Sequence, residues 1–428
     1  MSFNTYNPKM FKIYLLCIPI YLLPLLLLTG PFLPDLVVSV SALTFIYIIF
    51  KKEEYQYLNN KFFFLFFLYY IYLIITSLSS TDIYHSLSSS LFYFRFGIFS
   101  LLICYLIENN KFFVKHFFIF FLATFIIVLG DGVVQYIFGK NLIGLSMDST
   151  RLRLTLDDKI ILGGYISRMI PLLLGMIILL LVGKKLKIIT FSSLLISSCV
   201  VVILTGERTA LGIIILVSIM TLLFTKQFNL RIKIASFILS ILFMLSILIS
   251  NQSVYERMYE RTVMQFTNSK DVKDEIKFDN LVIFSSIHHS FIMTAINMFT
   301  DKPLIGHGPN QFRNKCSLEK YSHDLNSCST HPHNTYVQLL SETGLIGTIP
   351  VITIFIFLLY HLIFRKNYKS KEEKISLENY DYQTFIIMSL LITLWPFFPT
   401  QNFFNNYINI IYYLPLGFYL QTLIEFKK

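Results

Sequence analysis

Twelve long apolar stretches run through this chain, and they restrict its fold more than any other feature. Each is close to the ~20 residues that an α-helix needs to cross the hydrocarbon core of a membrane, the eleventh being shorter. They are Phe11–Thr29, Leu33–Phe50, Phe62–Ser79, Leu91–Glu108, Phe112–Leu129, Ile160–Val182, Ile188–Leu204, Ala210–Thr225, Ile232–Ser250, Gly344–Phe364, Phe385–Phe398 and Asn406–Phe426. The pattern predicts an all-α, polytopic membrane bundle of about 12 transmembrane helices, in one integral domain over residues 1–428.

The composition excludes a soluble protein. Of the 428 residues, 55% are hydrophobic and only 14% are charged, and a soluble protein of this size could not bury so much apolar surface. No small-residue cleavage site follows the first apolar stretch, which is therefore expected to be a retained span rather than a signal peptide.

Lysine and arginine residues collect on one side of the predicted bundle, which orients it. They are Lys9, Lys12, Lys51, Lys52, Lys61, Lys111, Lys115, Lys184, Lys185, Lys187, Lys226, Arg231, Lys233, the cations between Arg365 and Lys374, Lys427 and Lys428. The short turns on the other side carry none. Positive charge marks the cytoplasmic side, so both termini are predicted to be cytoplasmic. The net charge of +11 thus reports topology and calls for no nucleic-acid partner.

Two long segments fall on the opposite side, Asp131–Lys159 and Asn251–His333, which in a bacterium with two membranes is the periplasm. The second begins with a mixed-charge continuation of the ninth span, Asn251–Phe266. Within it, Ser286–Thr300 has apolar residues at helical spacing and predicts an amphipathic helix on the membrane surface. This helix either lines a site or only packs on the bundle. Its expected apolar positions are Ile287, Phe291, Ala295, Ile296 and Phe299.

Two of the five cysteines, Cys316 and Cys328, share this long external segment with eleven residues between them. An oxidising compartment favours a disulfide there over two free thiols. The remaining cysteines, Cys17, Cys104 and Cys199, lie in predicted spans and are expected to be small apolar packing residues.

Six of the nine histidines lie in the same segment: His288, His289, His307, His323, His331 and His333. A His-x-His pair such as His331 and His333 can ligate zinc. No carboxylate or cysteine stands at tight ligand spacing beside that pair, however. The pattern therefore favours a neutral imidazole acting as a base or as a hydrogen-bond partner.

Arginines near the external side are candidate anion-binding residues. Arg208 lies in a short turn, Thr205–Ala210, where its planar fork suits phosphate oxygens; an ion pair with Glu207 or snorkelling is the alternative. Arg151 and Arg153 end the shorter external segment and offer a second anion contact. Two further arginines, Arg95 and Arg168, fall inside predicted spans near their external ends, where arginine is either functional or snorkelling.

The most specific motif starts at His333-Asn334. Nine residues separate it from Gly344-Leu345-Ile346-Gly347, which opens a predicted span. With this motif the chain resembles the O-antigen ligase and polymerase superfamily. The other matching stretches are the Thr205–Ala210 turn, Asp301–Gly308 and Phe403–Asn406. The resemblance extends over nearly the whole chain.

The resemblance implies a site for undecaprenyl-diphosphate-linked glycan that needs no metal or other cofactor. By position, His333 and Arg208 are the expected catalytic residues. The residues expected to bind substrate are Arg151 or Arg153, His288, His331, Asn334, Arg168 and Arg95. Gly344, Gly347 and the cysteine pair are expected to be structural. The family often has an arginine where this chain has His288, and a glycine where it has Leu154, so one anion contact departs from the pattern.

The resemblance leaves two activities open in the bacterial inner membrane. A ligase transfers the finished O-antigen to lipid A-core, and a polymerase transfers it to another repeat unit; the histidine motif favours the ligase. No carboxylate pair of the glycosidase type stands out, which favours a single inverting displacement. A transporter of lipid-linked sugars is the hypothesis from another class, and it would place charges in both membrane halves.

Overall fold

The computed structural model describes residues 1–428 except 1–7, 149–150, 158, 268–283, 365–375 and 426–428. The cationic stretch expected between Arg365 and Lys374, and the terminal Lys427 and Lys428, lie outside the described residues. The described part is built from helices and contains no strand, only two isolated β-bridges.

Short turns and loops join the helices in chain order. They are α1 (Pro8–Leu26), α2 (Phe32–Lys52), η1 (Tyr55–Tyr57), α3 (Lys61–Leu78), α4 (Ile83–Ser90), α5 (Phe94–Asn109), α6 (Phe113–Phe138), α7 (Leu162–Leu180), α8 (Lys184–Leu204), α9 (Arg208–Phe224), α10 (Leu230–Ser250), α11 (Gln252–Tyr255), η2 (Glu256–Glu260), α12 (Arg261–Thr267), α13 (Ser286–Asp301), α14 (Phe312–Lys315), α15 (Thr335–Phe364), α16 (Leu377–Thr393) and α17 (Asn406–Glu425).

Within the described ranges, eight helices are long and apolar enough to cross a membrane: α2, α3, the α4–α5 run, α6, α7, α8, α10 and α15. Two shorter apolar helices are Leu16–Leu26 and α9. The predicted all-helical, multi-pass fold is therefore confirmed, while the count of twelve spans stays a prediction.

Helix α7 is the centre of the bundle. Nearly all of its residues are buried, as expected for a helix surrounded by others. Its neighbours include α16, α8, α9 and α6. At Gly175 a methyl group would come within 2.8 Å of Phe385 on α16, so the absence of a side chain permits this close crossing.

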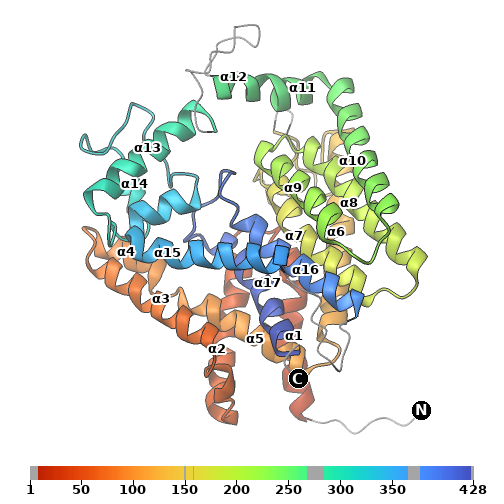
Figure 1. Cartoon of the computed structure of the whole chain (residues 1–428), viewed down its shortest axis with the longest axis horizontal. Coiled ribbons are helices and arrows are strands. Elements are labelled where there is room, and N and C mark those ends of the chain that lie inside the picture. Colours follow the sequence, from red (N-terminus) through yellow and green to blue (C-terminus); the bar gives the residue numbers. More distant parts are fainter. Residues whose placement is uncertain (1–7, 149–150, 158, 268–283, 365–375, 426–428) are drawn as a thin grey trace.

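The elements between α10 and α15 bridge two sides of the molecule (Figure 1). In that view α8, α9 and α10 stand on the right, whereas α3, α4, α13 and α14 lie on the left. Helices α11 and α12 run across the top from the end of α10, and α15 starts on the left and passes in front of the centre. The segment 251–333, called the long loop below, thus brings α13 opposite the first turn of α9.

Helix α15 is interrupted at Gly344, where φ is 63° and ψ is −168°. The backbone of Leu304 passes so close that a Cβ atom on Gly344 would lie 2.3 Å from its carbonyl oxygen. The freed N–H group of Leu345 donates to the carbonyl of Pro303 at 2.9 Å. Only glycine permits both the positive φ and this approach, which docks the long loop against α15. The predicted start of the span at Gly344 is thus a break, preceded by a helical segment from Thr335.

The end of α6 and the buried face of α13 also differ from the sequence prediction. Helix α6 continues nine residues past Leu129 to Phe138. Its Asp131 is buried and accepts the N–H of Leu142 at 2.6 Å, which supports the added turns. Helix α13 forms almost where predicted, but its buried stripe includes Phe291, Ala295 and Met298, while Ile287 is exposed.

Candidate active site

His333 stands directly before α15 and adopts a left-handed conformation with φ of 55°. Such a backbone is uncommon outside glycine, and surrounding contacts must hold it. The N–H of Thr400 donates to the carbonyl of His333 at 2.8 Å. Asn334 caps α15, because its side-chain oxygen accepts the N–H groups of Tyr336 at 3.0 Å and Val337 at 3.1 Å. A substrate contact by Asn334 stays a prediction.

The His333 ring lies in a cluster of aromatic rings. Its centroid is 4.0 Å from that of His331 and 5.2 Å from that of His288, and it stacks on Phe291 at 5.7 Å. His331 is fixed by two hydrogen bonds, since its Nε2–H donates to the carbonyl of Thr400 at 3.1 Å and its Nδ1 lies 2.9 Å from the Thr330 hydroxyl. The long loop and α13 therefore place three imidazoles together.

These imidazoles are neutral at physiological pH. Burial lowers the pKa of His333 to about 3, and the neighbouring His331 and His288 reinforce the shift. Burial likewise lowers the pKa of His331 to about 4. A neutral ring keeps a lone pair, so His333 can accept a hydrogen bond or a proton.

The cluster does not suit a zinc ion. Both ring nitrogens of His331 are engaged by Thr330 and Thr400, so neither is free to bind a metal. In the part of the chain that the structure describes, no group of three or more His, Cys, Asp or Glu side chains is arranged to hold one.

Arg208 is the first residue of α9, directly after Glu207. The amino end of a helix carries partial positive charge, so an arginine there is unfavourable unless an anion offsets it. The Glu207 carboxylate is directed to another helix, because its oxygens accept the N–H groups of Gly163 at 2.7 Å and Gly164 at 3.1 Å. Glu207 thereby ties the Arg208 turn to the start of α7.

Further cations gather at this turn. The Nε–H of Arg257 donates to the carbonyl of Gly206 at 2.9 Å, and Arg151 Cγ lies 3.7 Å from where a Cβ of Gly206 would be. Burial and the charges of Arg151, Arg208 and Arg261 together lower the pKa of Arg257 to about 10. Burial raises the pKa of Glu207 to about 7. Arg151, Arg208, Arg257 and Arg261 repel one another and are called the arginine cluster below. Such a group is suited to binding a polyanion.

His288 connects the arginine cluster to the histidines. Burial lowers the pKa of His288, and the positive charge of Arg208 lowers it further, so an electrostatic interaction links the two side chains. The ring of His288 also contacts that of His333 at 5.2 Å between centroids. His288 therefore interacts with both the predicted residues Arg208 and His333.

The other predicted arginines have partners in the fold. Arg95 forms an ion pair with Asp35 at 2.7 Å. Arg168 is buried in α7, where its Nη1 donates to the carbonyl of Gly164 at 3.2 Å on the side that also faces Glu207. The backbone N–H of Arg153 donates to the side chain of Gln135 at 2.9 Å. Their contacts with substrate stay predictions.

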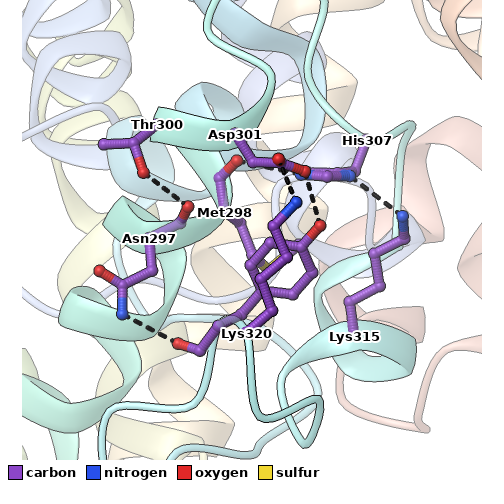
Figure 2. A network of polar contacts seen from close by, with 8 residues as sticks. Asn297, Met298, Thr300, Asp301, His307, Lys315 and Lys320 are labelled. Atoms are coloured by element: carbon purple, nitrogen blue, oxygen red, sulfur yellow. Dashed lines mark hydrogen bonds and ion pairs between the residues drawn. The ribbon is translucent and has the colours of Figure 1, made fainter.

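A second polar network lies within the long loop, between the end of α13 and α14 (Figure 2). His307 is buried between the Met298 carbonyl, which accepts its Nε2–H at 3.0 Å, and Lys315, which donates to its Nδ1 at 3.0 Å. Burial and the charge of Lys315 lower the pKa of His307 to about 4. Asp301 binds Lys320 in the same network. These contacts join the end of α13 to the loop around α14.

Cys316 and Cys328 form a disulfide in this loop, with their Cα atoms 5.1 Å apart. We expect neither thiol to react with a maleimide in protein taken from its native membrane, and both to react after reduction. Removing the bond should lower the free energy of unfolding of the loop by about 2–4 kcal/mol. Labelling of both cysteines without prior reduction would contradict the bond. Cys17, Cys104 and Cys199 are buried and free, and they supply the background for this measurement.

Comparison with known families identifies this region. Residues 192–352 match the family described as O-antigen ligase. The matched residues make up less than half of the chain, which is similar to this family over that part. The match runs from within α8 to the second half of α15 and includes Arg208, the long loop, His333, Gly344 and Gly347. Arg151 lies before it. No curated protein matches the chain.

The matched family is described as O-antigen ligase. In the described residues, eight helices are long and apolar enough to cross a membrane. The resemblance found in the sequence is thereby confirmed for residues 192–352, while its extension over nearly the whole chain stays a prediction. The sequence pattern assigns no role to one member of the arginine cluster, Arg257, because its segment looks like a mixed-charge continuation of the preceding span.

Proposed function

We propose that this protein is an O-antigen ligase. It transfers a glycan from undecaprenyl diphosphate to lipid A-core at the periplasmic face of the inner membrane. The observation that carries the proposal is the juxtaposition of the arginine cluster with the neutral imidazole of His333, joined through His288. One part is suited to a diphosphate and the other to a hydroxyl, which are the two groups that such a reaction brings together.

The arginine cluster stabilises the leaving group. When the bond between the anomeric carbon and the phosphate oxygen breaks, its electron pair stays on the phosphate and adds negative charge to the lipid diphosphate. Arg208 and Arg151 meet this developing charge with preorganised donors, so they bind the transition state more strongly than the ground state. Glu207 holds the Arg208 turn against α7 and keeps these donors in place.

His333 acts on the acceptor. A sugar hydroxyl of lipid A-core donates a hydrogen bond to the neutral ring, and its oxygen attacks the anomeric carbon from the face opposite the diphosphate. The proton passes to the His333 ring as the new glycosidic bond forms, and the anomeric configuration inverts. Because the pKa of His333 is about 3 in the free protein, transfer accompanies bond formation rather than preceding it.

Polymerisation is the second candidate, because the same chemistry joins repeat units when the acceptor is another lipid-linked glycan. The family description, O-antigen ligase, favours the ligase. A transporter of lipid-linked sugars is less favoured, since the arginine cluster and the histidines come from the start of α9 and from segments that the charge pattern predicts to be external.

The lipopolysaccharide profile of a deletion strain tests this proposal. Loss of capped core, with polymer retained on the lipid carrier, is the expected result for a ligase. Core carrying a single repeat unit would instead identify a polymerase. Unchanged bands would contradict both activities.

The proposed topology can be tested separately. Both termini are expected in the cytoplasm and the long loop in the periplasm, because the cations lie on one side of the predicted spans. A periplasm-dependent reporter fused after Asn326, in the described part of the long loop, should be active. A fusion after Lys226, on the other side, is the matched control and should be inactive. The reverse pattern would refute the orientation.

A further inference from the structure

Arg257 belongs to a single turn of π-helix, η2, between α11 and α12. Such turns are rare and occur frequently at functional sites, because they redirect side chains along a helix. In this protein the turn directs Arg257 onto the backbone of Gly206, two residues before Arg208. The Nε–H donates to the Gly206 carbonyl at 2.9 Å, which leaves the two terminal nitrogens of the guanidinium at the far end of the fork.

Gly206 is shaped for this contact. Its φ is 65°, and a Cβ atom there would lie 2.8 Å from Arg257 Cδ and 2.9 Å from Arg257 Nε. Any other residue would displace the arginine. The absence of a side chain at Gly206 therefore accommodates Arg257, and its positive φ is one that glycine adopts readily.

The charge balance of the region favours an anion. Arg151, Arg208 and Arg261 all raise the electrostatic cost of a charged Arg257, and burial adds to it. Glu207 is the carboxylate that partly offsets this charge, but its oxygens already accept two backbone N–H groups of α7. A surface loop would relieve such repulsion by extending Arg257 into water, whereas this side chain is hydrogen-bonded inward.

We infer that Arg257 is a further contact for the lipid diphosphate and that, with Arg208 and Arg151, it surrounds the two phosphate groups of the donor. This inference rests on the proposed function, in which the donor is a polyprenyl diphosphate. Arg257 occupies the role left open where His288 replaces an arginine on α13. The cation is supplied from α11–η2–α12 and approaches the anion beside the Arg208 turn.

Arg257 could instead serve only as a tether for the Gly206 turn, and the two roles differ in what they do to different ligands. A tether positions Arg208 and so affects every phosphate-bearing lipid equally. A direct contact to the second phosphate matters more for a diphosphate than for a monophosphate. The ratio of the two affinities therefore separates the roles.

The experiment uses the full-length protein in lipid nanodiscs, titrated with undecaprenyl diphosphate and with undecaprenyl monophosphate. Arg257→Ala is expected to weaken binding of the diphosphate by ~10-fold or more, because a charge-assisted, two-pronged contact is lost, and to change monophosphate binding by less than about threefold. Arg231→Ala is the matched control, because this substitution removes the same formal charge. Arg231 is exposed at the start of α10, whereas α11 and η2 follow the end of that helix. It should leave both affinities unchanged.

Arg257→Lys keeps the charge without the fork and should lose part of the diphosphate affinity, which decides the question even if the alanine variant folds poorly. An equal fall in both affinities, or wild-type diphosphate affinity in both variants, would overturn the inference while leaving the proposed function intact. Failure of the wild-type protein to bind undecaprenyl diphosphate would instead overturn the proposed donor, and the inference with it.

Discussion

Replacing His333 with alanine is expected to abolish detectable glycan transfer while leaving expression and membrane insertion unchanged. The His333 ring is neutral, lies where the long loop ends before α15, and contacts the ring of His288. General-base assistance typically contributes ~10²–10⁴ in rate, so a loss of that size should appear in a lipopolysaccharide band assay. Near-normal capping by the variant would refute the assigned role.

His331→Ala is the matched control for this prediction. His331 contacts His333 at 4.0 Å between ring centroids, but its nitrogens bind Thr330 and Thr400, so it positions the neighbouring ring. We expect a milder defect, and we expect EDTA to have no effect on the wild-type protein. Equal loss in both variants, together with inactivation by EDTA, would require a metal site instead.

The pH dependence adds a second measurement. The neutral form of His333 is the active form, and its pKa is lowered from 6.5 to about 3. Activity that depends on it should therefore be present above the lowered pKa and fall only as pH decreases toward it. In a reconstituted assay the acid limb is expected below about pH 5, rather than near the pKa of an exposed histidine.

The sequence is most informative where a motif carries its own geometry. The membrane class and α13 follow from apolar length and helical spacing, whereas the sequence predicts the break of α15 at Gly344 only as the start of a span. The convergence of His333, Arg208 and Arg151 is expected only from the resemblance, since these residues are far apart in the chain. The packing of α13 against α15 is what brings the histidines of the long loop together.

Other features depend on contacts that a sequence does not display. The extension of α6 rests on the hydrogen bond between Asp131 and Leu142, made after the chain has turned back. The buried face of α13 differs from the predicted face because polar residues of this helix contact other parts of the long loop. Ser290, for example, donates a hydrogen bond to Asp324. Arg257 escapes a sequence-based prediction for the same reason, since its partner Gly206 is 51 residues away.

Substitutions of Arg208 test whether this residue contributes only positive charge or a directed pair of hydrogen bonds to phosphate oxygens. Arg208 begins α9, where the helix itself disfavours a cation, and it lies among Arg151, Arg257 and Arg261, so an anionic ligand would be strongly stabilised beside it. Arg208→Ala is expected to reduce transfer by ~10²–10³, the effect of losing one preorganised donor to a developing anion.

Arg208→Lys should be nearly as damaging, because an ammonium group cannot make the parallel pair of hydrogen bonds that a guanidinium makes to phosphate oxygens. The matched control is Arg231→Lys: Arg231 is exposed at the start of α10 and has no predicted role in the site, so activity should change little. Transfer rates measured for purified variants at equal membrane insertion decide the outcome. If lysine at position 208 retains near-normal transfer, Arg208 supplies charge alone. The positive charge at the start of α9 would then attract the diphosphate, and no directed hydrogen bond would be needed to explain the rate.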